Sequence, residues 1–162
     1  MVNGMKFTDF IRPNAIIISL KSTKKEDVIR EMVKALQEAD GVPEDELESV
    51  IEAVMKREEL GSTGIGHGVA VPHAKHASVE SLAGLVAVSA DCVDFDSLDR
   101  EPVQLFFMIV SPVDRPGEHL RALEHITRKL KDDSFVRSLK QARSPEEAYG
   151  ALQEADDKPS EA

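Results

Sequence analysis

Residues 103–110, Val-Gln-Leu-Phe-Phe-Met-Ile-Val, give the strongest strand signal in the chain. A run that is apolar at nearly every position indicates a strand buried on both faces of a sheet, since alternate side chains point to opposite faces. The segment Ser-Pro-Val-Asp-Arg-Pro-Gly, residues 111–117, ends the run with turn-forming residues. We therefore expect this strand to lie at the centre of the fold.

Further strands and helices alternate on either side of this central run. Residues 82–90 are also apolar almost throughout, which predicts a second buried strand. Periodic apolar residues and capping signals predict helices between the strands. The other expected strands are 15–20 and 69–71, and the expected helices are Ser22 or Thr23 to Gly41, Pro43 to Leu60, 116–130, 133–141 and 144–152. This order predicts an α/β fold, a single three-layer α/β/α domain around a mixed β-sheet.

Length and composition are those of one globular domain. The chain has 162 residues, of which 41% are hydrophobic and 31% are charged. We expect the domain to span residues 1–155 and residues 156–162, which are polar and include a proline, to form a disordered tail. No internal repeat, low-complexity segment or interdomain linker is evident.

Charge and cysteine content narrow the classes of partner and compartment. A net charge of −10 argues against nonspecific nucleic-acid binding, which needs clustered Lys and Arg. The single cysteine, Cys92, cannot form a disulfide within the chain, as is usual in a reducing cytoplasm. No signal-peptide pattern is seen, and the apolar runs are too short to span a membrane. We expect a cytoplasmic protein that binds other proteins and does not insert into membranes.

The stretch Arg57–Lys75, REELGSTGIGHGVAVPHAK, has the features of a phosphate site. Closely spaced glycines allow positive φ angles, and consecutive backbone N–H groups can form a concave anion-binding nest. Arg57 precedes this loop and offers a planar fork of donors that matches phosphate oxygens. Pro72 restricts the backbone, so His73 leaves a short β segment in a defined direction and is suited to nucleophilic attack on phosphorus. The candidates for a phosphate-binding loop are Thr63, Gly64, Gly66 and Gly68.

Other functions of this stretch fit less well. The glycines lack the Lys-Ser/Thr pair of a nucleotide P-loop. They also follow a predicted helix, whereas the glycines of a dinucleotide fingerprint follow a strand. Ser62 and His73 lack the strand-turn-helix setting of a serine nucleophile. His67, His73 and His76 are close in sequence, but no nearby Cys or carboxylate completes a recognised metal spacing. No metal and no cofactor are expected.

The run Gly-Ser-Thr-Gly-Ile-Gly-His-Gly-Val-Ala-Val-Pro-His-Ala, residues 61–74, resembles the phosphohistidine signature of the type-2 (fructose/mannitol class) IIA components of the bacterial phosphoenolpyruvate:sugar phosphotransferase system. Within this class, the free-standing nitrogen-regulatory IIA proteins are the most similar. The resemblance extends over residues 7–153 and includes Arg57-Glu58, Val71-Pro72-His73 and Glu118-His119-Leu120. The chain departs from the pattern at His67, Ala74 and His76.

The resemblance implies a phosphotransferase with a phosphohistidine intermediate on His73, flanked by Arg57 and His119. It implies a histidine-containing phosphocarrier protein as donor, and either regulatory target proteins or a IIB domain as acceptor. From position alone, Arg57 could also complement the dipole at a helix C-terminus, and His119 could be a partly buried histidine in the first turn of a helix. The two functions that remain are a phosphorylation-dependent regulator and a IIA component of a sugar permease.

Overall fold

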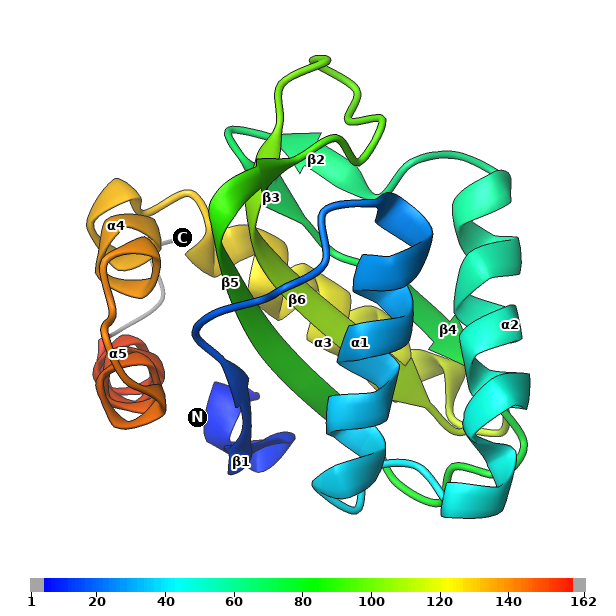
Figure 1. The fold of residues 1–162 in the computed structure, drawn as a ribbon. Coiled ribbons are helices and arrows are strands. Elements are labelled where there is room, and N and C mark those ends of the chain that lie inside the picture. The colour runs from blue at the N-terminus through cyan, green and yellow to red at the C-terminus, as the bar shows by residue number, and fades with distance from the viewer. Residues whose placement is uncertain (1–4, 159–162) are drawn as a thin grey trace.

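The computed structural model describes residues 5–158, which form a mixed six-stranded sheet with helices on both faces (Figure 1). The strands are β1 (Ile11–Ile17), β2 (Gly64–Gly66), β3 (Val69–Ala70), β4 (His73–Lys75), β5 (Ala83–Val93) and β6 (Val103–Ser111). The helices are η1 (Phe7–Asp9), α1 (Lys25–Glu38), η2 (Glu44–Glu46), α2 (Leu47–Glu59), α3 (Pro116–Lys129), α4 (Asp133–Lys140) and α5 (Pro145–Asp157).

Strand β6 lies at the centre of the sheet, as its apolar sequence predicted. The strand order is β1-β5-β6-β3-β2, and β4 also pairs with β6. β5 and β6 are antiparallel, whereas β3 and β4 both run parallel to β6 along its other side. Pro72 separates β3 from β4, because proline has no N–H for the ladder, although its carbonyl still accepts from Ile109 N–H at 3.0 Å. His73 therefore begins a new strand segment directly beside the central strand.

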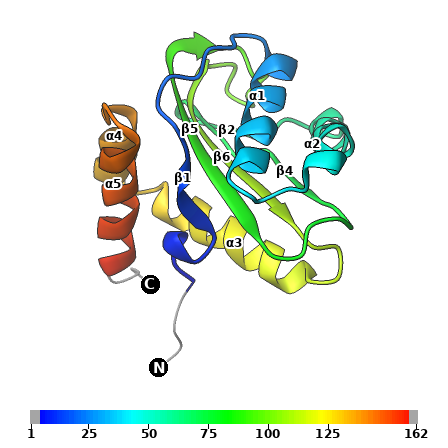
Figure 2. The same cartoon turned by 60° about the horizontal axis from the view of Figure 1, so that its bottom comes forward.

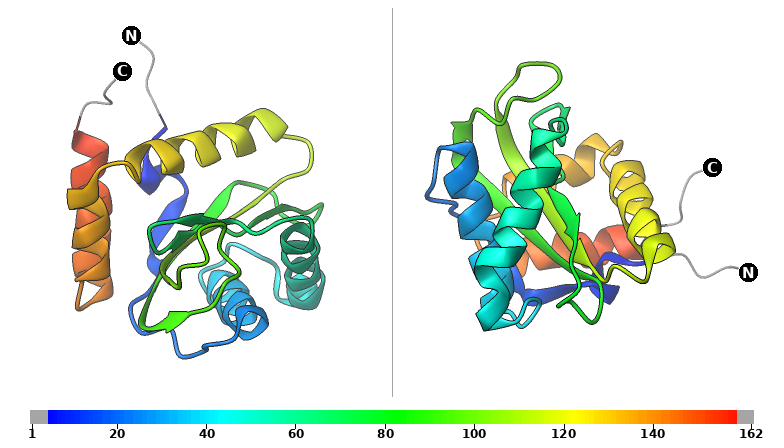
Figure 3. Two further views of the ribbon diagram at one scale, coloured as in Figure 1. Left: turned by 90° about the horizontal axis from the view of Figure 1, so that it is seen from above. Right: turned by 90° about the vertical axis from the view of Figure 1, so that its right-hand side faces the viewer.

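The helices complete a three-layer α/β/α arrangement, which confirms the predicted fold class. α1 and α2 cover one face of the sheet and α3 crosses the opposite face (Figures 2 and 3). α4 and α5 pack against each other beside β1 (Figure 2). The core lies where β5 and β6 are covered on both faces, and every residue of β6 except Gln104 is buried.

The first strand begins earlier than the predicted segment 15–20. β1 runs from Ile11 to Ile17 and includes Pro13, which is tolerated because β1 is an edge strand with a register shift between Ile11 and Ile16. Ile11 packs closely against its partner Gly84 of β5. A Cβ at Gly84 would lie only 2.9 Å from the Ile11 side chain, so the lack of a side chain at Gly84 permits this contact. The sequence does not show that Gly84 pairs with Ile11, so it does not reveal where β1 begins.

Both ends of α1 differ from the predicted caps. The helix starts at Lys25 with Lys24 at the N-cap position, and no side chain caps it. Ser22 instead binds Glu31, with its hydroxyl donating to Oε1 at 2.8 Å. At the other end Asp40 has φ 63°, and the following Gly41 N–H donates to Leu36 O at 2.8 Å. The left-handed residue is therefore Asp40, one position before the predicted glycine.

The C-terminal helix continues past the predicted boundary at 155/156. α5 ends at Asp157, and the side chain of Asp156 is only 4% exposed. Asp156 accepts hydrogen bonds from Phe7 N–H at 2.7 Å, Thr8 N–H at 3.1 Å and the Thr8 hydroxyl at 3.0 Å. Asp156 thus joins the last turn of α5 to η1, while residues 159–162 of the predicted tail lie outside the described residues.

Asp156→Asn is expected to destabilise the fold by about 2 kcal/mol, because an amide group in place of Oδ2 would face two donors of Thr8 and the charge-assisted hydrogen bonds would be lost. Urea denaturation of the variant measures this difference. Asp157→Asn, at the neighbouring exposed position, is the control and should stay within about 0.5 kcal/mol of the wild type. Equal stability of the two variants would contradict the assigned role of Asp156.

Candidate active site

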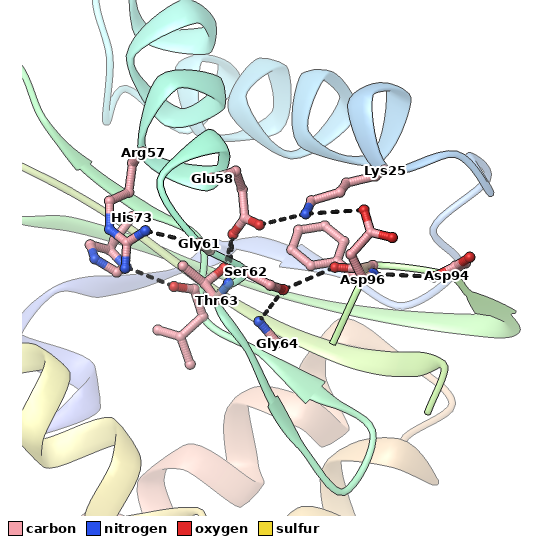
Figure 4. Close-up of polar contacts among 12 residues, drawn as sticks. Lys25, Arg57, Glu58, Gly61, Ser62, Thr63, Gly64, His73, Asp94 and Asp96 are labelled. Carbon is pink, nitrogen blue, oxygen red and sulfur yellow. Dashed lines mark hydrogen bonds and ion pairs between the residues drawn. The ribbon is translucent and has the colours of Figure 1, made fainter. Parts of the chain in front are cut away.

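His73 is the first residue of β4, and the hydrogen bond of its ring defines which nitrogen can react. Nδ1 lies 2.8 Å from Val71 O (Figure 4). A carbonyl oxygen only accepts, so in the neutral ring Nδ1 has the proton and Nε2 has the free lone pair. The side chain is partly exposed. Nε2 is therefore the nucleophilic atom of this residue.

The surroundings of His73 keep its ring neutral. Burial lowers the pKa of His73 from its ordinary value, and the nearby cations Arg57 and Lys75 lower it further. The hydrogen bond to Val71 and the carboxylate of Glu58 oppose this pKa shift but do not reverse it. At pH 7 the imidazole has its lone pair available, as nucleophilic attack requires.

Arg57 extends from the last turn of α2 towards His73 (Figure 4). Its Nη1 donates to Gly61 O at 2.9 Å, which holds the guanidinium beside the loop that follows the helix. A guanidinium has five N–H donors, so this single hydrogen bond leaves others for an incoming anion. Arg57 therefore lies beside His73 and stays a candidate for binding phosphate.

His119 lies in the first turn of α3 with its ring next to that of His73. The two ring centroids are 5.4 Å apart, with an angle of 55° between the planes. His119 is buried, and its Nδ1 is hydrogen-bonded to the hydroxyl of Ser111. Burial, together with the neighbouring His73 and Lys75, lowers the pKa of His119 to about 4. The structure therefore brings His73, Arg57 and His119 together, with two neutral imidazoles in contact.

Thr63 lies in the loop between α2 and β2 and is held by Glu58, the residue after Arg57. Glu58 is buried and accepts from Thr63 N–H at 3.0 Å and from the Thr63 hydroxyl. Its other oxygen lies 2.7 Å from Lys25 Nζ of α1 (Figure 4). Since the Thr63 amide donates to Glu58, it does not face His73. Thr63 supports the loop instead of forming part of an anion nest.

The glycines predicted as a phosphate-binding loop shape a hairpin instead. Gly64 N–H donates to Ser62 Oγ at 3.0 Å, and a side chain there would collide with Ser97. Gly66 and Gly68, with φ 97° and 77°, form the β2–β3 turn, where Val69 pairs with Leu105 of β6. His73 pairs with Ile109, four residues further along β6, which corresponds to about 13 Å. The predicted nest is therefore not formed by Gly66 and Gly68.

The first turn of α3 supplies anion-binding potential in place of that nest. The first N–H groups of a helix have no intrahelical partner, and the helix dipole favours negative charge at this end. α3 begins at Pro116, and His119 is its fourth residue, so this end of the helix lies beside His73. The first turn of α3, Arg57 and a neutral histidine therefore lie around the ring of His73.

Two side chains of the site were not identified from the sequence. Ser111 was interpreted only as part of the break after the central strand, and no local spacing links it to His119. Lys25 is not singled out by any sequence pattern, yet it pairs with Glu58, 33 positions later. Both contacts depend on tertiary packing, so no periodic pattern could have revealed them.

The remaining histidines lie in other surroundings. His76 binds Ser49 through Nε2 and Ser78 through Nδ1, each at 2.7 Å. His67 is in the β2–β3 turn with φ 58°, and His125 is buried against Phe7. Within residues 5–158, no cluster of three or more His, Cys, Asp or Glu side chains is placed to hold a metal ion. In the same part of the chain, every helix is too short or too polar to cross a membrane.

Comparison with known proteins gives a consistent set of relatives. The family model "Phosphoenolpyruvate-dependent sugar phosphotransferase system, EIIA 2" matches residues 9–155. A nitrogen regulatory protein of Bradyrhizobium diazoefficiens is 35% identical over 148 residues, 91% of this chain and 95% of the relative. The fructose-specific EIIABC component of Bacillus subtilis is 36% identical over 94% of this chain, which spans only 24% of that longer protein. The crystal structure of nitrogen regulatory protein IIA-Ntr from Neisseria meningitidis superposes with a TM-score of 0.81 at 31% identity, covering 89% of this chain and 97% of the other.

Proposed function

Since this chain belongs to the EIIA type-2 family of the phosphoenolpyruvate-dependent sugar phosphotransferase system, we propose that it is a phosphoryl carrier that accepts a phosphoryl group on Nε2 of His73. The single observation that best supports this site is the hydrogen bond from His73 Nδ1 to Val71 O, which leaves Nε2 as a free nucleophile. The lowered pKa of His73 supports the same role, because it keeps that nitrogen unprotonated at pH 7.

The transfer moves a phosphoryl group between two imidazoles. The N–P bond of a phosphohistidine on the donor breaks while a bond from His73 Nε2 to phosphorus forms, and the donor imidazole leaves with the electron pair. Such a reaction needs in-line placement and charge stabilisation more than covalent help. Arg57, the first turn of α3 and an N–H of His119 are the groups that would stabilise the phosphoryl oxygens.

The proposed donor is a histidine-containing phosphocarrier protein, and the phosphorylated form would act as a regulator by selecting its target proteins. The likeness to nitrogen regulatory proteins from Bradyrhizobium and Neisseria supports this assignment. The alternative is a IIA component that passes its phosphoryl group to a IIB domain, which the likeness to the fructose-specific component supports. Mixing the phosphorylated chain with purified IIB domains distinguishes the two, because rapid loss of the phosphoryl group to one of them would favour the permease component.

Incubation of the purified chain with the phosphorylated form of a histidine-containing phosphocarrier protein is expected to add one phosphoryl group to the chain. The bond should be lost in acid and survive in alkali, because the phosphorus is attached to an imidazole nitrogen. Mass spectrometry of intact protein after each treatment measures the outcome. A label that survives mild acid would place the phosphoryl group on a hydroxyl such as that of Ser62 and contradict the proposal.

A further inference from the structure

Ser111 is the last residue of β6 and the hydrogen-bond partner of His119 Nδ1. Its side chain is fully buried between the end of the central strand and the first turn of α3. Ser111 is eight positions before His119, so the β6–α3 connection brings them together. The hydroxyl of Ser111 contacts His119, so an influence of Ser111 on phosphoryl transfer would pass through that histidine.

A neutral histidine has one N–H, and the hydrogen bond at one nitrogen decides where that proton lies. Burial and nearby positive charge lower the pKa of His119 to about 4, so at pH 7 the ring is neutral. If the Ser111 hydroxyl donates to Nδ1, the ring proton is on Nε2. If Nδ1 donates to Ser111, Nε2 presents a lone pair, which would repel an anionic phosphoryl group on His73.

Burial of Ser111 selects between these two arrangements. Within the described residues, the Ser111 hydroxyl has a hydrogen bond to His119 Nδ1 and to no other group. If Nδ1 were the donor, the proton of the buried hydroxyl would have no acceptor, a condition that folded proteins strongly avoid. Donation from Ser111 to Nδ1 satisfies both atoms at once. The same arrangement turns Nε2 into an N–H donor.

We propose that Ser111 is a positioning residue that fixes the proton of His119 on Nε2 and orients the ring so that this N–H can donate to a phosphoryl group on His73. The role of this N–H in binding a phosphoryl group rests on the proposed function, but the position of the proton does not. The hydroxyl of Ser111 neither gains nor loses a covalent bond in the transfer.

The position of the proton is measured on the unphosphorylated full chain, labelled with ¹⁵N, by long-range ¹H–¹⁵N correlation spectra of the imidazole rings. His119→Ala identifies the signals of His119 among the five histidines. The expected result at pH 7 is a protonated Nε2 and an unprotonated Nδ1 that accepts a hydrogen bond. A protonated Nδ1 in the wild type would overturn the proposal whatever the labelling rates are.

Labelling kinetics test whether Ser111 acts through His119. Ser111→Ala is expected to slow phosphoryl acceptance about tenfold, the size of effect that the loss of one neutral hydrogen bond produces. In the His119→Ala background the same substitution should have no further effect. A tenfold loss that persists without His119, or an unchanged rate in folded Ser111→Ala, would overturn the proposal.

Two further variants control for structural damage. Ser89→Ala removes another buried serine from the neighbouring strand β5, at the end of the sheet opposite Ser111, and should leave the rate unchanged. Ser111→Cys keeps nearly the same volume with a weak S–H donor, so its rate should lie between those of Ser and Ala. If the wild type shows the expected proton position but accepts no phosphoryl group, the proposed function fails, while the part of the inference that concerns the proton on His119 stands.

Discussion

His73→Ala is expected to accept no phosphoryl group at all. Within the described residues, His119 is the only other imidazole in contact with His73, and its Nδ1 is occupied by Ser111 while its Nε2 is proposed to be protonated. No neighbouring side chain can therefore replace the attacking nitrogen. Incubation with donor and phosphoenolpyruvate, followed by intact mass measurement, detects even slow incorporation.

The two residues beside the nucleophile should give a different result. His119→Ala is expected to slow labelling by about 10²–10³, the usual effect of removing one preorganised donor from a site of developing charge. Arg57→Lys keeps the positive charge but loses the planar fork, so labelling should slow without being abolished. The expected set is one inactive variant and two slow variants.

His76→Ala is the matched control for this set. His76 follows β4 directly and is partly exposed, and its ring binds Ser49 and Ser78. Its backbone N–H donates to Ser111 O at 3.0 Å, a hydrogen bond that alanine retains. Its removal should leave the labelling rate unchanged. If His119→Ala were inactive and His73→Ala were labelled normally, the nucleophile would be His119, and the assignment of Nε2 of His73 would be wrong.

The sequence predicted those parts of the fold that depend on local patterns. The apolar run at residues 103–110 gave the central strand because burial on both faces leaves a continuous signal. The start of α5 was also correct, because Ser144 caps it through Glu147 N–H and Pro145 occupies its first turn. The start of β1 was predicted too late, because Ile11 pairs with Gly84, which is distant in sequence. Gly84 has no side chain that would mark this contact in an apolar pattern.

The candidate site also has parts that local sequence patterns predicted and parts that they did not. His73 was predicted as a site residue because it follows Pro72 and the glycines in sequence, and the structure places Arg57 and His119 beside it. The glycines themselves were misinterpreted, because positive φ angles serve a hairpin turn as well as an anion nest. Sequence alone does not distinguish these uses, since the difference lies in where the N–H groups point.

Glu58 is the buried charge on which the loop before β2 depends. It is 6% exposed, accepts from Thr63 N–H and hydroxyl, and is paired with Lys25 at 2.7 Å. Lys25 also lies 4.8 Å from the centre of the Phe95 ring, so the ammonium packs over an aromatic face. Three segments of the chain, α1, the end of α2 and the loop 61–64, therefore meet at one carboxylate (Figure 4).

Glu58→Ala is expected to lower the free energy of unfolding by about 3 kcal/mol, because Thr63 loses the acceptor of its buried amide and Lys25 loses its partner. The estimate lies at the low end for a broken buried pair, since the Lys25 side chain is 21% exposed and can still be hydrated. Glu59→Ala, an exposed neighbour in the same helical turn, should change stability by less than about 0.5 kcal/mol.

Glu58→Gln separates the two contributions to this loss. The amide oxygen can still accept from Thr63 N–H, but the ion pair with Lys25 is lost, so its stability should lie between those of the wild type and Glu58→Ala. Urea denaturation measures all three variants, and labelling at a temperature where each is folded tests the site. Because Glu58 directly follows Arg57 and holds the loop whose Gly61 O binds Arg57, Glu58→Ala should also slow labelling. A variant as stable and as rapidly labelled as Glu59→Ala would show that the loop is held by other contacts.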